Sequence, residues 1–259
     1  MADDQVKKCK SMRVLVEHMN NAGITGGLVC KTYKDATIAN TSLTADINRL
    51  RDMPEDKKSL KDAQSNIISL KDRYKEKVKG VWFILPSCTN EIPAPVDLPD
   101  AMKKHNIAAM TVNPLMHRYI PRKFVIGDYM EMAQELKIPV LFNTVRGITL
   151  EQIDDLLKDF PDLTTILTYA QCWPNDRLLR PFLDEYPNLH LDMTYILTDS
   201  WLKEMLIKYP AEKILFGSGF PISYMGANMM VIKHAEIKWE DKIKIAGKNL
   251  INLINWKTV

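Results

Sequence analysis

Short runs of β-branched and aliphatic residues alternate along this chain with longer segments of helical period. Seven such runs are predicted as strands, at 26–30, 81–85, 107–112, 139–142, 165–169, 189–193 and 213–217. Strands that alternate with helices are typical of βα units, whose strands pair in parallel. An open doubly wound sheet would usually carry a glycine-rich loop after its first strand, but here Gly23, Gly26 and Gly27 precede a strand. The pattern therefore favours a (β/α)8 barrel formed as one domain by residues 1–259.

Helix boundaries are marked by residues with specific backbone preferences. Thr149 and Gln152 form the sequence signature of a capping box, so a helix is expected to start there. Pro161 and Pro187 each follow a helical segment, which should end before the proline because the preceding residue is disfavoured in the α region. Gly23 stands where a left-handed C-terminal stop would fall.

The region from 35 to 79 is the least regular part of the sequence. It is rich in lysine and aspartate, and helices are predicted at 41–51 and 59–78. Its charges are most simply interpreted as a solvated helical face.

Composition excludes several classes of function. The 35 basic and 32 acidic residues leave a formal charge of +3 and are scattered along the chain, which argues against nucleic acid as the main partner. No uncharged apolar run reaches the length of a membrane span, and the first ten residues lack the apolar core of a signal peptide. The four cysteines show no CxxC spacing, which favours reduced thiols. We therefore expect a cytoplasmic protein that binds neither nucleic acid nor membrane.

Several segments resemble the amidohydrolase-related family of metal-dependent hydrolases and decarboxylases. The segment 211–221 reads Ala-Glu-Lys-Ile-Leu-Phe-Gly-Ser-Gly-Phe-Pro and is similar to the family's eighth strand, Ile-Leu-Phe-Gly-Ser-Asp-Phe/Tyr-Pro. Other segments resemble the family's lead-in to the second strand, its fifth strand, the approaches to the sixth and seventh strands, and its closing helix: 15–24, 136–142, 160–169, 183–192 and 240–253. The resemblance covers most of the chain in the family's order, and it implies a TIM barrel.

The resemblance also shows where this sequence departs from the family's metal site. The family pattern has His-X-His on the first strand, a histidine at the ends of the fifth and sixth strands, and an aspartate on the eighth. Asn143, Tyr169 and Gly219 stand at the last three positions, and no His-X-His occurs in the sequence. Residues 3–9 could form a short edge strand but carry no ligand pair, so the first strand is interpreted as degenerate or missing. We therefore predict no metal site and no cofactor.

The five histidines do not replace the missing ligands. His18 and His105 fall in predicted helices, His190 opens a strand at the amino end of the barrel, and His234 lies in the helix after the last strand. His117 is expected on a loop at the functional face, but one histidine does not make a metal site.

Residues that follow the predicted strands should gather at the carboxyl-end mouth of the barrel, where the sites of such barrels lie. The ligand-binding candidates are Cys88, Asn113, His117, Asn143, Arg146, Tyr169, Cys172, Tyr195, Ser218 and Tyr224. Arg146 is the natural partner for a carboxylate. Two interpretations stay open with equal weight: these groups bind a small molecule, or they plug the mouth, with Tyr169 filling the space of the metal. A nucleophile and base formed by Cys88 or Cys172 with His117 is disfavoured, because the spacing supports no such pair.

Three hypotheses about function follow. The leading one is an amidohydrolase-like barrel that has lost hydrolase activity and binds a small anionic or aromatic molecule, or acts structurally. The rival is a divergent hydrolase or decarboxylase that acts on a small carboxylic acid or lactone. The third is an interaction protein whose partner covers the edge left by the missing first strand, since unpaired strand edges invite pairing. We also expect a homodimer.

Overall fold

The computed structural model describes residues 12–29, 78–86, 95–104, 106–169, 176–196, 198–220 and 223–255. The predicted edge strand at 3–9, the predicted helix at 41–51 and residues 59–77 of the helix predicted at 59–78 lie outside these residues, as do Cys88, His105 and Cys172.

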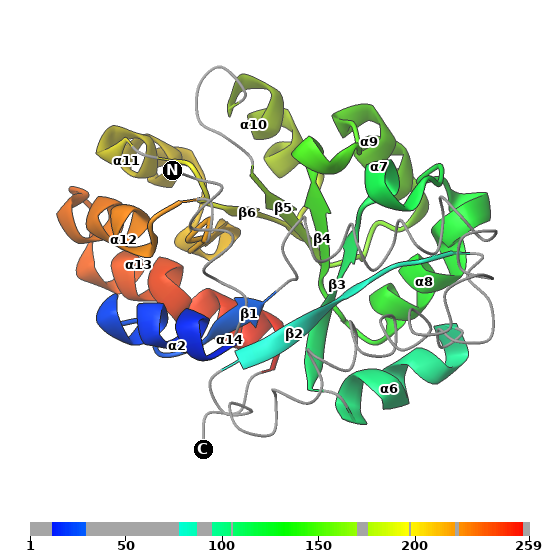
Figure 1. Ribbon diagram of the computed structural model, residues 1–259. Coiled ribbons are helices and arrows are strands. Elements are labelled where there is room, and N and C mark those ends of the chain that lie inside the picture. Colours follow the sequence, from blue (N-terminus) through cyan, green and yellow to red (C-terminus); the bar gives the residue numbers. More distant parts are fainter. Residues whose placement is uncertain are drawn as a thin grey trace.

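Seven parallel strands form one sheet, and each strand pairs with the next one along the chain. The strands are β1 (Gly27–Val29), β2 (Val78–Phe83), β3 (Ile107–Val112), β4 (Val140–Asn143), β5 (Thr165–Thr168), β6 (Leu189–Asp192) and β7 (Ile214–Leu215). The sheet curls into a half-barrel of the TIM-barrel type, with helices on its outside (Figure 1). The predicted α/β barrel is confirmed. Strands β4, β5 and β7 are those that resemble the family's fifth, sixth and eighth strands.

All seven predicted strands are present, with corrections in the second and the last. Strand β7 covers only 214–215 of the predicted 213–217. Strand β2 starts at Val78, three residues earlier than predicted, so the helix predicted at 59–78 is wrong at its last residue. Val78, Lys79 and Gly80 pair in register with the three residues of β1. Pairing with β1 therefore decides the conformation of residues 78–80, although the charge pattern before them favours a helix. Such pairing between distant segments commonly overrides the local helix preference of a sequence.

From β2 onward, helices connect successive strands, and helices cover the outer face of the sheet (Figure 1). The α-helices are α2 (Met12–Asn21), α6 (Leu98–Lys104), α7 (Pro114–His117), α8 (Lys123–Glu135), α9 (Leu150–Asp159), α10 (Asp176–Glu185), α11 (Asp199–Lys208), α12 (Met225–His234), α13 (Trp239–Ile243) and α14 (Asn249–Leu253). Shorter turns are η1 (Pro95–Asp97), η2 (Thr144–Arg146), η3 (Ala211–Lys213) and the π-helical η4 (Lys244–Lys248). Across the described ranges, no helix has both the length and the apolarity needed to cross a membrane.

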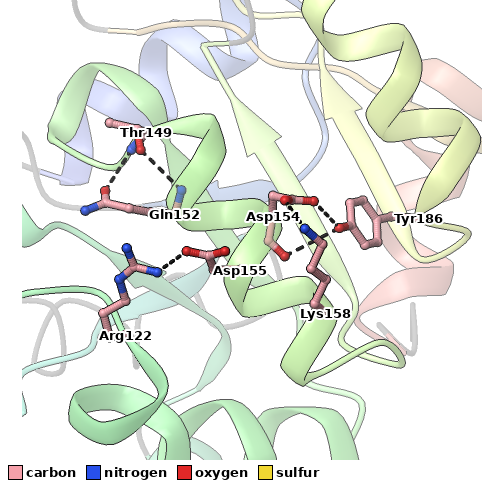
Figure 2. Close-up of polar contacts among 7 residues, drawn as sticks. All are labelled: Arg122, Thr149, Gln152, Asp154, Asp155, Lys158 and Tyr186. Carbon is pink, nitrogen blue, oxygen red and sulfur yellow. Dashed lines mark hydrogen bonds and ion pairs between the residues drawn. The ribbon is translucent and has the colours of Figure 1, made fainter.

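Helix α9 shows how the sequence defines these elements. The Thr149 hydroxyl accepts from the Gln152 N–H (3.2 Å), and the Gln152 side chain accepts from the Thr149 N–H (3.0 Å), so the predicted capping box is confirmed (Figure 2). Ile153, Leu156 and Leu157 share one face of the helix and are buried against the sheet. The helix ends at Asp159, as the following Pro161 predicts.

The exposed side of α9 is linked to its neighbours by charged side chains. Asp155 pairs with Arg122, the residue just before α8, and Asp154 accepts a hydrogen bond from the hydroxyl of Tyr186, which follows α10 (Figure 2). Lys158 pairs with Asp154 one turn away, at 2.5 Å. These pairs are partly exposed, so each contributes little to the free energy of unfolding.

The strands divide their side chains between two layers. Met110, Val112, Phe142, Leu167 and Leu191 belong to the main hydrophobic core between the sheet and the helices. Because successive strand residues point to opposite faces, the residues between these face the inside of the barrel. The inner layer is apolar near the middle of the strands, where the buried residues Val81, Phe83, Ala109, Ile166 and Leu215 lie outside that core cluster.

Candidate functional site

The inner layer becomes polar at the carboxyl ends of the strands. Alternation places five side chains there, from four neighbouring strands: Thr111, Asn113, Asn143, Thr168 and Asp192. The first four residues are buried and Asp192 is half-buried. The carboxyl end of such a barrel is where ligands and substrates bind, so this polar layer is the candidate site.

The strand register brings the polar residues next to one another. Val112 pairs with Phe142, which places Asn113 beside Asn143, and Asn143 pairs with Thr168 on β5. Neighbouring strands lie about 4.8 Å apart, so the amides of Asn113 and Asn143 are within reach of one small molecule.

The two threonines of the layer use their hydroxyls to bind the sheet. Thr111 Oγ1 donates to the Leu141 carbonyl (3.0 Å), and Thr168 Oγ1 donates to the Phe142 carbonyl (3.4 Å). Their donors are therefore engaged within the protein, and the two asparagines provide the remaining amide groups of the layer.

Asn143 ends β4 and also caps the turn η2. Its Oδ1 accepts from the Val145 N–H at 3.1 Å, which fixes the side chain at the strand end. This hydrogen bond uses the amide oxygen and leaves the Nδ2 group as the donor on the inner face.

Asn113 stands at the N-cap position of α7 but does not cap the helix. Pro114 occupies the first helical position, and the Asn113 side chain makes no capping hydrogen bond. The residue is fully buried, and neither Oδ1 nor Nδ2 has a hydrogen-bond partner within the described part of the chain. Its backbone N–H donates to the Tyr119 hydroxyl at 3.2 Å. The side-chain amide of Asn113 is thus held in place without being used by the fold described here.

His117 is the last residue of α7, and the predicted loop is instead one helical turn. Pro114 presets the backbone for this turn, and the His117 N–H donates to the Asn113 carbonyl at 3.1 Å. The ring is buried, with the Phe83 ring edge-on at 5.3 Å and the Tyr119 ring stacked at 6.3 Å between centroids. Burial raises the pKa of the Tyr119 phenol above its usual range.

Asp192, which ends β6, is a site residue that the sequence analysis missed. Its Oδ1 accepts from the Thr194 N–H at 2.8 Å, and the carboxyl also accepts from the Thr194 hydroxyl and the Tyr169 N–H. Although the residue is half-buried, its carboxyl group is enclosed by these partners. Burial raises the pKa of Asp192 to about 6, against the lowering effect of the three hydrogen bonds.

Tyr169 and Tyr195 follow β5 and β6 in left-handed backbone conformations, with φ of +59° and +65°. Their rings lie 5.2 Å apart with an interplanar angle of 57°. Asp192 accepts the Tyr169 N–H and the N–H of Thr194, the residue before Tyr195. One carboxyl therefore anchors both turns that carry this tyrosine pair.

The segment after β7 packs closely against the Asp192 turn. A Cβ atom on Gly217 would lie 2.6 Å from Asp192 Oδ2 and closer still to the Thr194 hydroxyl, so only glycine fits there. Gly219 has a φ of +64°, and a Cβ there would lie 3.1 Å from Ser223 Cβ. Ser218 Oγ accepts from the Phe220 N–H at 3.3 Å, which shapes this turn.

The remaining predicted site residues have mixed placements. Tyr224 is the N-cap residue of α12 and is 69% exposed, so its ring lies on the surface. Arg146 ends η2, but its side chain is outside the described structure, as are Cys88 and Cys172. From the predicted set, the strand register thus places Asn113 beside Asn143, and a ring contact joins Tyr169 to Tyr195.

The positions that resemble the family's metal ligands do not fit a metal ion. The Asn143 oxygen accepts a backbone N–H, Tyr169 carries a phenol, and Gly219 has no side chain. Nowhere in the described ranges do three or more His, Cys, Asp or Glu side chains gather in a way that could hold a metal ion. The nearby Asp192 carboxyl already accepts three hydrogen bonds.

The family is established by a sequence comparison. The amidohydrolase family model matches residues 70–249, which is more than half of the 259-residue chain. The chain belongs to the amidohydrolase family. No curated protein sequence shows significant similarity to this amidohydrolase-family chain.

Solved structures with the same fold include decarboxylases. An uncharacterized TIM-barrel protein from Bordetella bronchiseptica has a TM-score of 0.67 at 19% identity, over 95% of this chain and 83% of that one. A 5-carboxyvanillate decarboxylase from Sphingomonas paucimobilis has a TM-score of 0.66 at 11% identity, over 93% and 82%. A dihydroxybenzoic acid decarboxylase from Polaromonas sp. JS666, with bound manganese and the inhibitor 2-nitroresorcinol, has a TM-score of 0.65 at 16% identity, over 94% and 86%. At these identities the likeness establishes the shared fold.

The sequence prediction considered only residues that follow each predicted strand. It therefore missed three residues that lie within the strands: Thr111, Thr168 and Asp192. The signal that could have found them is the period-two alternation itself. In 189–192, Leu-His-Leu-Asp, the two leucines mark the outer face, which assigns the aspartate to the inside of the barrel.

Proposed function

We propose that this amidohydrolase-family protein binds a small aromatic molecule at the carboxyl end of its barrel without a metal ion, and that it lacks the metal-dependent hydrolase activity of its family. The observation that carries the proposal is the chemistry at three strand ends. Asn143, Tyr169 and Gly219 stand at the positions that resemble metal ligands, and none is a strong ligand for a divalent transition metal.

Support for binding comes from the groups that the site leaves for a ligand. The inner layer holds two asparagine amides, and the tyrosine pair lies beside it at the ends of β5 and β6. A few oriented polar groups together with aromatic rings are the usual composition of a small-molecule site. Arg146 stays the predicted partner for a carboxylate on such a molecule.

Thermal unfolding with and without metal tests the proposal. A metal ion at one hundred times its dissociation constant would stabilise the protein by about 2.7 kcal/mol, which is readily measured. We expect the melting temperature to be unchanged by zinc or manganese and by prior treatment with a chelator, with magnesium at the same ionic strength as the control. A saturable rise that is specific to zinc or manganese would contradict the proposal.

A second candidate function is supported by Asp192. A buried carboxyl with a pKa of about 6 is suited to transfer protons near neutral pH, and perturbed carboxyls of this kind concentrate at active sites. This candidate is a divergent hydrolase or decarboxylase that acts on a small carboxylic acid or lactone through acid–base chemistry. Turnover that resists chelators and is lost in Asp192→Asn would favour it, whereas turnover that survives this change would exclude Asp192 as the proton donor.

A further inference from the structure

Asn113 differs from Asn228 and Asn249, two other buried asparagines in the described part of the chain. Asn249 donates to the Ala211 and Ile214 carbonyls at 2.7 and 2.9 Å, and Asn228 donates to the Met193 and Gly217 carbonyls. Asn113 is equally buried but has no side-chain partner among the described residues. Asn228 and Asn249 hold strands and helices together, while the Asn113 amide serves no such role there.

A buried amide without partners is unfavourable, so Asn113 is expected to pair with a group from outside the described fold. The amide presents an acceptor and a donor side by side, in the plane of one group. The adjacent Asn143 adds a second N–H donor, because its own oxygen is bound to Val145. A group that satisfies this set must both donate one hydrogen bond and accept at least one.

The acceptor of the Asn113 amide restricts the ligand further. A carboxylate ligand has no proton to donate to Asn113 Oδ1, so it would leave this buried oxygen unpaired. An uncharged planar group with a donor and an acceptor side by side can pair with both atoms of the amide.

We infer that the ligand carries an uncharged, planar group with a donor and an acceptor side by side, as in a primary amide or a lactam, and that Asn113 pairs with it in both directions. This inference rests on the proposed function, because it names the class of molecule that the same site binds.

Calorimetric binding measurements with matched small molecules test the inference. Benzamide and 2-pyridone carry the expected donor and acceptor, whereas benzoate has the shape of benzamide with two acceptors and a negative charge. At pH 8 and millimolar concentrations, we expect benzamide or 2-pyridone to bind at least about fivefold more tightly than benzoate, since a buried polar group left without its partner weakens binding by about this factor or more. The exposed Asn252 on α14 provides the control, and Asn252→Ala should bind as the unchanged protein does.

The variant Asn113→Leu separates a binding role from a structural one. It should weaken benzamide or 2-pyridone binding at least about tenfold, and it should leave the melting temperature unchanged or raised, because no hydrogen bond within the described fold is lost. Asn249→Leu should lower the melting temperature, since it removes two buried hydrogen bonds.

Three results would overturn the inference. In the first, benzoate binds as tightly as the uncharged probes. In the second, Asn113→Leu binds the probes as the unchanged protein does. In the third, no probe binds at all, in which case ordered water forms the hydrogen bonds of Asn113. Preferred benzoate binding would leave the proposed binding function intact. A stoichiometric metal ion would contradict the proposed function without reference to Asn113.

Discussion

The substitution Asp192→Asn should remove a pH dependence from the stability of the protein. The carboxyl is enclosed at the end of β6, and burial raises its pKa from an ordinary 3.8 to about 6. At 1.36 kcal/mol for each pKa unit, this difference corresponds to about 3 kcal/mol between the two protonation states. Asparagine has nearly the same shape and keeps one oxygen for the Thr194 and Tyr169 donors, so the uncharged state is retained at every pH.

The sign follows from the protons bound in each state. Well below pH 3.8 the carboxyl is protonated in both the folded and the unfolded chain. As the pH rises toward 6, the unfolded chain loses the proton while the folded protein keeps it, so the folded state binds more protons and becomes less stable. The free energy of unfolding of the unchanged protein, minus that of Asp192→Asn, should therefore fall by about 2.4 kcal/mol from pH 4 to pH 7, most of the total of about 3 kcal/mol, and stay nearly constant above pH 7.

Urea unfolding followed by tryptophan fluorescence at several pH values between 4 and 8 measures this difference. Groups that titrate in both proteins cancel in the subtraction. Asp184→Asn is the control, because Lys208 lies 2.6 Å from the Asp184 carboxylate and lowers its pKa below the ordinary 3.8, so the corresponding difference should stay nearly constant between pH 4 and pH 8. A difference for Asp192→Asn that is constant or rises with pH would refute the reasoning, since the hydrogen bonds to the carboxylate would then outweigh its burial.

Two pairs of substitutions test the packing and the helix cap. Gly217→Ala should lower the free energy of unfolding by about 1–3 kcal/mol, because the added carbon overlaps Thr194. The control Gly247→Ala places its added carbon where no atom lies within 4 Å, so it should be neutral or stabilising. Equal effects of the two substitutions in urea unfolding would contradict this prediction. Thr149→Ala should lower the free energy of unfolding by about 1 kcal/mol, because it removes the capping box. Thr198→Ala should lower it much less, because Thr198 makes no capping hydrogen bond. Calorimetric melting measures both variants, and a larger loss in Thr198→Ala than in Thr149→Ala would contradict the prediction.

The fold was predictable from the sequence because it depends on patterns that tertiary structure reinforces. Apolar runs became the parallel strands, and the capping box at Thr149 and the stop before Pro161 marked helix ends correctly. The start of β2 was missed, since 78–80 has no apolar run and is held in the sheet by pairing with β1. Local sequence carries no signal for such a partner distant along the chain.

The site was predictable only in part, because its key features depend on precise geometry. Asn113 and Asn143 were found from their places at strand ends. The unused amide of Asn113 could not be foreseen, since an asparagine before a helix usually caps it. The pairing of Tyr169 and Tyr195 requires two left-handed tyrosines, and this conformation is uncommon for residues other than glycine, asparagine and aspartate.

The metal content of the purified protein tests the central claim most directly. Protein prepared without added metal or chelator should be analysed for zinc, manganese and iron by elemental mass spectrometry, with protein concentration measured on the same sample. The proposed metal-free site predicts only trace amounts of each metal. A catalytic metal site would retain its ion through dialysis. About one such tightly held ion per chain would contradict the claim.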